Sequence, residues 1–363
     1  MIQRKRTREI KIGKIKIGGN NPIAVQTMCN TKTRDAEATV KQIREVEEAG
    51  CEIIRVTVND MDAAKALPAI KKDINIPLVA DIHFDYKLAL EAAKTVDKLR
   101  INPGNIGSQE KIEAVVKAAK DRNLPIRIGV NGGSIEKEII AKYPGTKVPP
   151  EAAVESAMRH VKILEDLDFE DIAISIKFSD VQRTMKSYEL ISSKVDYPLH
   201  VGVTEAGTVW AGTIANSIGI GALLLEGIGD TIRVSLAGPL TEEVRAGFQI
   251  LKSLELREKG PRITACPTCG RTEIDLIGLA EKVEQAVAAR KITAPIHIAV
   301  MGCVVNGPGE AREADIGVCG GKKMGVIIKK GIVLRNVPEE NLFEEFMKEV
   351  EKTAKEHDAK KKK

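Results

Sequence analysis

The sequence predicts an α/β protein, a (β/α)8 TIM-like barrel followed by a small α+β domain. Three observations carry this prediction. Eight short runs rich in Val, Ile and Leu recur along the chain, and each is followed by a segment of helical length. These units occupy about 250 residues, the usual size of such a barrel. The alternation stops at REKGPR, residues 257–262, a charged Gly-Pro segment typical of a linker.

The eight predicted strands share a high content of branched apolar residues. They are 23–28, 53–58, 77–84, 98–103, 125–130, 172–178, 198–204 and 231–236. An open doubly wound sheet fits less well, because such sheets usually carry a glycine-rich nucleotide fingerprint after the first strand. IAVQTMCNTKT, which follows the start of the first strand here, has none. The pattern therefore favours the barrel.

Helix signals fill the gaps between the strands. The amphipathic segments are 36–50, 108–123, 151–167 and 241–257. The first ends at Gly50, and the last begins with Thr241 as the expected N-cap and Glu243 inside its first turn.

Two domains are expected, 1–257 for the barrel and 262–358 for the smaller unit. The second unit starts with a strand and turn in RITACPTCGRT, continues with a long amphipathic helix and a strand, IHIAVMGC, and adds short strands around DIGVCGG, MGVIIKK and GIVLRN. The helix PEENLFEEFMKEVEKTAKEH follows them.

Composition excludes several classes of protein. With 43% hydrophobic and 29% charged residues the chain can form a sizeable core, so disorder is a poor interpretation. The net charge of +5 and the 3% of aromatic residues give no indication of nucleic-acid binding. The start, MIQRKRTREI, has no apolar run behind it, and the apolar stretch 218–229 is too short to span a membrane. We expect a cytoplasmic protein whose six Cys do not form a disulfide framework, and whose clustered Cys serve metal or redox chemistry.

Three cysteines and a glutamate have the spacing of a metal centre. Cys266 and Cys269 form C-P-T-C, and Cys303 follows after 33 intervening residues, with Glu310 beyond it across an NGPG turn sequence. Three thiolates and a carboxylate suit an iron-sulfur cluster with one weakly held iron, open to a substrate oxygen. The alternatives are a redox dithiol, a structural zinc site, for which His297 is the nearby imidazole, or a buried core position for Cys303. The remaining cysteines, Cys29, Cys51 and Cys319, lack partners at ligand spacing and are interpreted as structural.

Polar residues at alternate positions of the predicted strands point into the barrel or its mouth, where such barrels have their active sites. The pairs of equal parity are Arg100 with Asn102, Arg127 with Asn131, Asp81 with His83, and Arg233 with Ser235; Arg55, Lys177 and Glu205 add single groups. Four arginines and a lysine predict an anion site, best matched by a diphosphate. The alternative for each cation is a structural ion pair with Asp81, Glu205 or another carboxylate, and His83 alone could be a core histidine.

The motifs ACPTCGRT, MGCVVNGPGEA, DIGVCGG, RINPGNIG and RIGVNGGS together resemble the 4-hydroxy-3-methylbut-2-enyl diphosphate synthase family of the non-mevalonate isoprenoid pathway. The resemblance covers nearly the whole chain. It implies a barrel that binds 2-C-methyl-D-erythritol 2,4-cyclodiphosphate and a small α+β iron-sulfur domain with a [4Fe-4S] cluster. The ligands would be Cys266, Cys269, Cys303 and Glu310.

The resemblance also implies roles for the barrel residues. Substrate would be bound by Arg55, Arg100, Asn102, Arg127, Asn131, Lys177, Arg233 and Ser235, and Glu205, His83 and Glu310 would serve catalysis. The implied reaction is reductive ring opening and dehydration, with ferredoxin or flavodoxin as the electron donor and a head-to-tail homodimer as the working form. Two other classes stay open: a pterin-dependent transferase on the same kind of barrel, and a non-catalytic iron-sulfur or zinc module.

Overall fold

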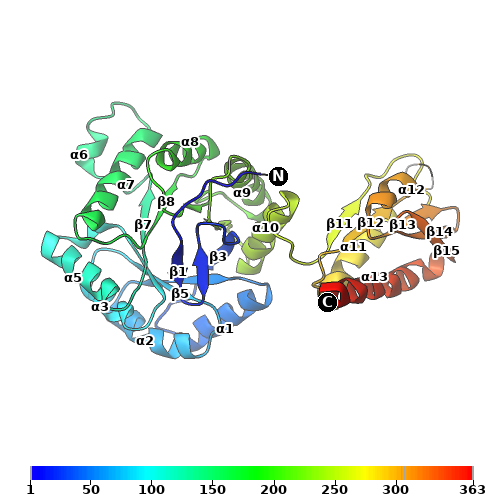
Figure 1. The fold of residues 1–363 in the computed structure, drawn as a ribbon, viewed down its shortest axis with the longest axis horizontal. Helices are drawn as coiled ribbons and strands as arrows, with labels where there is room; N and C mark the ends of the chain where they lie inside the picture. The colour runs from blue at the N-terminus through cyan, green and yellow to red at the C-terminus, as the bar shows by residue number, and fades with distance from the viewer. Residues whose placement is uncertain (1, 304, 306, 362–363) are drawn as a thin grey trace. The chain divides into compact units, whose positions relative to one another are not determined.

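The structure, a computed structural model, describes residues 2–303, 305 and 307–361 and divides into two compact units, 1–257 and 258–363 (Figure 1). None of the helices in the described residues is both long enough and apolar enough to cross a membrane.

The first unit is the predicted barrel. Its strands are β3 (Ala24–Met28), β4 (Ile53–Val58), β5 (Leu78–Ile82), β6 (Lys98–Ile101), β7 (Ile126–Asn131), β8 (Ile172–Lys177), β9 (His200–Val201) and β10 (Thr231–Ile232). They form one sheet in the order β8-β7-β6-β5-β4-β3-β10-β9, and the described ladders within it are all parallel. A parallel bridge between Ile174 and Leu199 joins the two ends of this order, so the sheet is closed.

Helices surround the sheet, as Figure 1 shows. They are α1 (Ala36–Glu48), α2 (Met61–Lys72), α3 (Tyr86–Ala93), α4 (Pro103–Ile106), α5 (Gln109–Lys120), α6 (Lys137–Ile140), α7 (Pro150–Glu165), α8 (Val181–Ser192), α9 (Val209–Leu225) and α10 (Leu240–Ser253). Asp35, Asp60, Asp85 and Asp180 cap four of them by accepting a backbone N–H of the first turn.

The start of α10 differs from the prediction. Its N-cap is Pro239 rather than Thr241, which lies inside the first turn. Pro239 fixes an extended backbone immediately before the helix, with φ −60° and ψ 137°, and so moves the start forward. Glu243 is turned toward the barrel, where its carboxylate accepts the N–H of Leu236 at 2.9 Å.

A hairpin that the sequence analysis did not anticipate precedes the barrel. Strands β1 (Ile10–Ile12) and β2 (Ile15–Ile17) pair antiparallel. Their isoleucines form a separate apolar cluster with residues at the amino-terminal half of the barrel strands, namely Ala24, Ile53, Val79 and Ala173. The hairpin therefore closes the amino-terminal end of the lumen, and the opposite end is left for ligands.

The strand registers stack the inward side chains in layers of four from alternate strands. From the hairpin upward the layers are Ile53, Lys98, Ala173, Thr231; then Gln26, Val79, Arg127, His200; then Arg55, Arg100, Ser175, Arg233; then Met28, Asp81, Gly129, Gly202. Bulky apolar residues usually fill such layers. Here polar and charged groups dominate the two middle layers, so the lumen is built for something other than packing.

The last two barrel strands are shorter than predicted, because a side chain replaces part of their ladder. Asn216 of α9 is fully buried, and its amide oxygen accepts the N–H of Val203 at 3.1 Å. Its amide nitrogen donates to the carbonyls of Gly212 at 3.0 Å and Ser235 at 3.4 Å. One side chain thus satisfies the backbone beyond β9 and β10.

The second unit contains a five-stranded sheet in the order β11-β12-β13-β14-β15. The strands are β11 (Arg262–Ala265), β12 (His297–Met301), β13 (Ile316–Gly321), β14 (Met324–Lys329) and β15 (Ile332–Pro338), parallel up to β13 and antiparallel after it. Helices α11 (Leu276–Ala289) and α13 (Glu339–Lys361) share a core with the sheet, and a short turn of helix, α12 (Gly307–Glu310), follows β12.

Replacing Asn216 by Ala should lower the free energy of unfolding by about 1–3 kcal/mol, because buried backbone groups lose their partner. Urea unfolding followed by circular dichroism measures this. Ser217→Ala, one position along the same helix, is the matched control and should change stability by less than about 0.5 kcal/mol. Equal effects of the two changes would contradict the role given to Asn216.

Candidate active site

Six cationic side chains lie in the barrel lumen of the described residues, against two carboxylates. The cations are Arg55, Lys98, Arg100, Arg127, Lys177 and Arg233, and the carboxylates are Asp81 and Glu243. All are buried except Arg55 and Arg233, which are nearly so. The sequence analysis anticipated five of these cations and Asp81.

Asp81 is the central counter-charge. Its Oδ1 accepts from Arg100 Nη1 at 2.9 Å, and its Oδ2 lies 3.8 Å from Arg55 Nε. Burial alone would raise the pKa of Asp81, but Arg55, His83 and Arg100 outweigh it and hold that pKa well below its usual range. Asp81 is therefore ionised, and one carboxylate serves two guanidinium groups.

Arg100 crosses the lumen because Gly129 leaves room for it. A Cβ at Gly129 would come within 2.2 Å of Arg100 Nε. The guanidinium instead donates through Nη2 to the Gly129 carbonyl at 3.0 Å. Arg100 Nη1 also lies 2.8 Å from His83 Nε2, and that ring nitrogen lies 3.5 Å from Asp81 Oδ1.

Glu243 is a site residue that the sequence analysis interpreted only as a first-turn acid of the last barrel helix. It is 2% exposed, lies 3.5 Å from Arg233 Nε and accepts a hydrogen bond from Thr27. Glu243 lies on a helix, so the alternation of side chains along strands says nothing about it. Only the spacing of the apolar residues around it along the helix could have suggested that it points toward the barrel. It neutralises part of the charge of Arg233.

The lower lumen contains polar groups that have no partner. Lys98 Nζ, Arg127 Nε and Nη1, and both amide atoms of Gln26 are buried without a hydrogen bond in the described structure. Burial lowers the pKa of Lys98 and of Arg127 well below the usual values, and neighbouring arginines lower it further. Lys98 has the same parity as Arg100 and Asn102, so the signal that finds those residues also finds Lys98; the sequence analysis missed it.

Arg55 shows how burial beside other cations disfavours the charged form of an arginine. Burial lowers its pKa to about 9, Asp81 opposes the fall, and Arg233 and Arg100 add to it. Its guanidinium contacts the thioether sulfur of Met28, a weak acceptor, at 2.6 Å from Nη2. Buried cations with so few carboxylates favour the binding of an anion, and a diphosphate can accept from several guanidinium groups at once.

The other predicted substrate and proton-transfer residues lie toward the carboxyl ends of the strands. Asn102 and Ser235 are buried, Asn131 ends β7 half-buried, and the Ser235 hydroxyl has no partner in the described structure. His83 and Glu205 are exposed, and Glu205 has a left-handed backbone with φ 54° just beyond β9. The sequence analysis gave a structural ion pair as the alternative role for each lumen cation. Asp81 pairs with two arginines, so this alternative applies to some of the cations.

The second unit brings two predicted ligand cysteines to one edge of its sheet. Cys266 follows β11 and Cys303 lies two residues beyond β12, and these strands are parallel neighbours. Both thiols are half-buried, and the N–H of Gly302 lies 3.3 Å from Cys266 Sγ. Cys269 is exposed on the loop after Cys266, where Thr272 Oγ1 accepts its N–H at 3.1 Å.

Glu310 is exposed at the end of α12. Residues 304 and 306 of the intervening segment lie outside the described residues. Across 2–303, 305 and 307–361, no three His, Cys, Asp or Glu side chains are gathered as a ready metal site. The predicted four-ligand set is therefore not assembled, although its sulfurs emerge from neighbouring loops.

Cys319 lies in β13, buried beside Gly307. Burial raises the pKa of Cys319 to about 12, and Cys303 and Cys266 add to the rise. Cys319 therefore stays a protonated thiol, unlike a thiolate ligand. The cysteines in the barrel, Cys29 and Cys51, are buried in the apolar core, as structural residues are.

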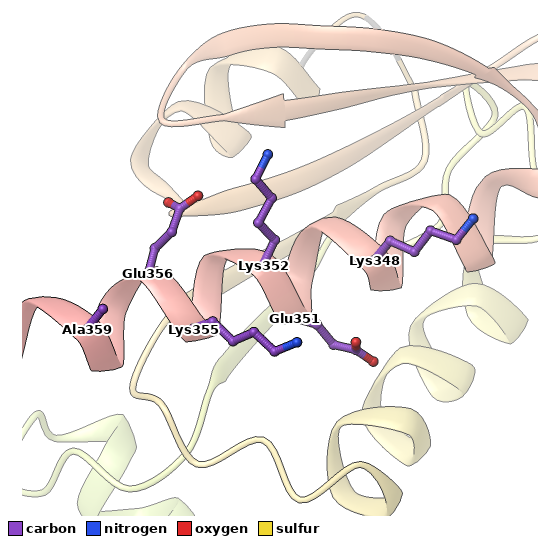
Figure 2. Close-up of a pocket in the computed structure, with 6 residues that line it drawn as sticks. All are labelled: Lys348, Glu351, Lys352, Lys355, Glu356 and Ala359. Atoms are coloured by element: carbon purple, nitrogen blue, oxygen red, sulfur yellow. The ribbon is translucent and has the colours of Figure 1, made fainter.

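A hollow on α13 is a separate feature, drawn in Figure 2. It is lined by Lys348, Glu351, Lys352, Lys355, Glu356 and Ala359, and none of the lumen residues or thiols contributes to it. Glu351 pairs with Arg290 and Glu356 with Lys329, each at 2.7 Å. Exposed ion pairs of this kind are ordinary surface features.

The fold and site define a class, a TIM-barrel protein with buried cations in its lumen and a second domain that carries cysteines at one edge of its sheet. Family comparison makes this specific. Residues 7–248 match the GcpE TIM-barrel domain, and residues 262–352 match the GcpE protein C-terminal domain. The chain belongs to the GcpE family.

Curated relatives cover almost the whole chain. A protein of Caldanaerobacter subterraneus subsp. tengcongensis is 60% identical over 354 residues, 97% of this chain and 99% of the relative. Proteins of Clostridium perfringens and Geobacillus thermodenitrificans are 58% and 55% identical, covering 96% and 100% of this chain and 99% and 96% of the relatives. All three are named 4-hydroxy-3-methylbut-2-en-1-yl diphosphate synthase (flavodoxin).

Two solved structures match about two thirds of this chain. A dihydropteroate synthetase structure matches with a TM-score of 0.51 at 10% identity, covering 68% of this chain and all of that chain. The Yersinia pestis dihydropteroate synthase matches with a TM-score of 0.50 at 9% identity, over 69% of this chain and all of that one. At such identity the likeness shows the fold, and it does not favour the pterin-dependent alternative.

Asp81→Asn should lower stability by about 3–5 kcal/mol, because it leaves buried guanidinium charge uncompensated. Saturating inorganic pyrophosphate should recover part of that loss by supplying the missing negative charge. Thermal unfolding with and without pyrophosphate measures both effects. Asp230→Asn, which removes a buried carboxylate that pairs with Arg4 outside the lumen, should destabilise without pyrophosphate rescue. Equal rescue of both variants would contradict the anion site.

Proposed function

We propose that this protein is a 4-hydroxy-3-methylbut-2-enyl diphosphate synthase, which converts 2-C-methyl-D-erythritol 2,4-cyclodiphosphate into 4-hydroxy-3-methylbut-2-enyl diphosphate. The observation that carries the proposal is the lumen, where six cations face two carboxylates. The names of the curated relatives agree with it. In the balanced reaction the substrate takes up two electrons and one proton. The ring bond between carbon and a diphosphate oxygen breaks, and a hydroxyl group of the substrate leaves as water.

The barrel residues bind and orient the diphosphate. Arg55, Arg100, Arg127, Lys177 and Arg233 supply charge from five strands, while Asn102, Asn131 and Ser235 supply hydrogen bonds nearer the mouth. Arg100 and Arg233 are held by Asp81 and Glu243, so their guanidinium groups are oriented before substrate arrives. The cations stabilise the negative charge that develops on the diphosphate as the carbon–oxygen bond breaks.

The donor set of the second unit fits an iron-sulfur cluster. Cys266 and Cys303 are half-buried and Cys269 is exposed, and the N–H of Gly302 lies close enough to Cys266 Sγ for a hydrogen bond of the kind that stabilises cluster sulfur. With Glu310 as the fourth ligand they would hold a [4Fe-4S] cluster. When bound, such a cluster supplies electrons singly from the donor protein.

Two barrel residues are suited to moving protons. Glu205 is exposed beyond β9, and its carboxyl can reach a substrate hydroxyl at the mouth. His83 Nε2 lies 2.8 Å from Arg100 Nη1 and 3.5 Å from Asp81 Oδ1. Glu205 delivers the proton that leaves in water, and His83 keeps Arg100 aligned or acts as a second donor.

The proposal extends to partners and compartment. The names of the relatives favour flavodoxin as the electron donor, with ferredoxin as the chemically equivalent alternative. A head-to-tail homodimer would join the lumen of one copy to the thiol domain of the other. The cysteines of the described residues form no disulfide, which suits a reducing compartment, and we place the protein in the cytoplasm.

Cys266→Ala should abolish anaerobic turnover of the cyclodiphosphate with reduced flavodoxin. Iron should fall from about four per chain, with loss of the broad absorbance near 400 nm that thiolate-ligated iron clusters show. Cys319→Ala is the matched control, a thiol of the same unit that should retain iron and activity. Full iron and turnover in Cys266→Ala, or zinc in place of iron in anaerobically purified protein, would contradict the proposal.

Mixing two inactive variants tests the homodimer. Arg127→Met removes a lumen cation and Cys266→Ala a cluster ligand, so each protein alone should be inactive. Random subunit exchange in a head-to-tail dimer leaves one intact site in each mixed dimer, which restores about a quarter of wild-type activity. If each copy used its own two domains, the mixture would stay inactive.

A further inference from the structure

The contact between Lys177 and His200 connects a predicted substrate cation to a buried histidine that has no role in the site so far. Lys177 Nζ lies 3.2 Å from His200 Nε2, and both side chains are buried. His200 Nδ1 lies 2.8 Å from Thr231 Oγ1. The three residues come from strands β8, β9 and β10.

The donors and acceptors of this chain are fixed by Lys177. A lysine ammonium can only donate, so His200 Nε2 accepts, and the ring proton lies on Nδ1 and is donated to Thr231. The imidazole is therefore neutral. Burial lowers the pKa of His200 well below its usual value, and Lys177 lowers it further, which agrees with a neutral ring.

The space for this contact comes from Gly202. A Cβ at that position would approach the Lys177 ammonium to 3.1 Å and the Arg233 carbonyl to 2.2 Å. Gly202 lies in the layer between Lys177 and His200, so its missing side chain lets the ammonium reach down to the imidazole.

The backbone on which the pair sits is also fixed. One bridge, between Ile174 and Leu199, pairs β8 with β9, and the N–H of Thr204 donates to the carbonyl of Phe178 further along. Beyond the bridge the Tyr188 hydroxyl accepts the N–H of Ile176 at 3.2 Å and donates to the carbonyl of His200. Tyr188 therefore holds the two strands together where their ladder opens, next to both members of the pair.

We propose that His200 is a positioning residue, which fixes the Lys177 ammonium in the lumen so that it meets the substrate diphosphate. This inference rests on the proposed function. Among the described residues, the charged groups that act on the pair are Arg127, Arg233, Arg55, Arg100 and Lys98, all of them cations, so His200 supplies an acceptor where these neighbours supply none. Without it the ammonium would lose both its orientation and a partner that favours its charge.

His200→Leu should raise the dissociation constant for the cyclodiphosphate about tenfold, as measured by titration calorimetry at pH 7.5. His200→Gln keeps an acceptor oxygen, so its dissociation constant should stay within about threefold of the wild-type value. Burial and the surrounding cations lower the pKa of Lys177, and losing the acceptor lowers it further. The affinity of His200→Leu should therefore fall more steeply than that of wild type between pH 6 and 8.5. His160→Leu, the change of a buried histidine paired with Glu136 outside the lumen, should reduce stability but not affinity.

A double-mutant cycle shows whether His200 acts through Lys177. Lys177→Met should weaken binding at least as much as His200→Leu, and the double variant should be no weaker than Lys177→Met. Additive losses, or equal affinities of His200→Leu and His200→Gln, would overturn the inference. If His200→Leu does not fold, Thr231→Val replaces it in the cycle, with an expected loss of about threefold.

The same measurements separate this inference from the proposed function. Unchanged affinity in Lys177→Met, for the cyclodiphosphate and for inorganic pyrophosphate, would mean that Lys177 does not bind the diphosphate, and the proposed site would fail. A loss in Lys177→Met with wild-type affinity in His200→Leu would overturn only the role of His200.

Discussion

The barrel depends on one constraint, the excess of buried positive charge in its lumen. Asp81 and Glu243 compensate part of it, and each does so while holding a guanidinium group in place. Within the part of the chain that the structure describes, nitrogens of Lys98 and Arg127 have no hydrogen-bond partner, so the rest of this charge is left uncompensated. Buried charge without a partner is costly, so the free protein gives up stability for a site that a polyanion completes.

Small residues are as important to this lumen as the charged ones. Gly129 admits the guanidinium of Arg100, and Gly202 admits the ammonium of Lys177. The barrel must be closed below for the charges to act in a dry environment, and the β1–β2 hairpin provides that closure. In such barrels branched apolar side chains usually fill the lumen. Here the buried cations, the room left by the two glycines and the hairpin that closes the amino-terminal end together make the lumen suited to binding.

The two units divide the chemistry between them. The lumen offers fixed positive charge and few groups that can change oxidation state, whereas the second unit offers accessible thiols on adjacent loops and a buried, protonated Cys319 behind them. Family membership joins these halves in one protein. Anion binding needs buried positive charge, whereas electron transfer from a donor protein needs groups near the surface. This difference gives a physical reason for two domains.

The sequence by itself determined the barrel, because a repeated strand-and-helix pattern can close in few ways, and strand parity found most of the lumen cations and Asp81. The same parity covers Lys98, which was overlooked. Glu243, His200, Asn216 and the hairpin were decided only by the tertiary structure. Each acts through contacts with residues far away in the chain, and the local periodicity of a sequence does not reveal such contacts. Glu243 is on a helix, and Asn216 replaces backbone pairing between strands. His200 matters only because Gly202 leaves space above it.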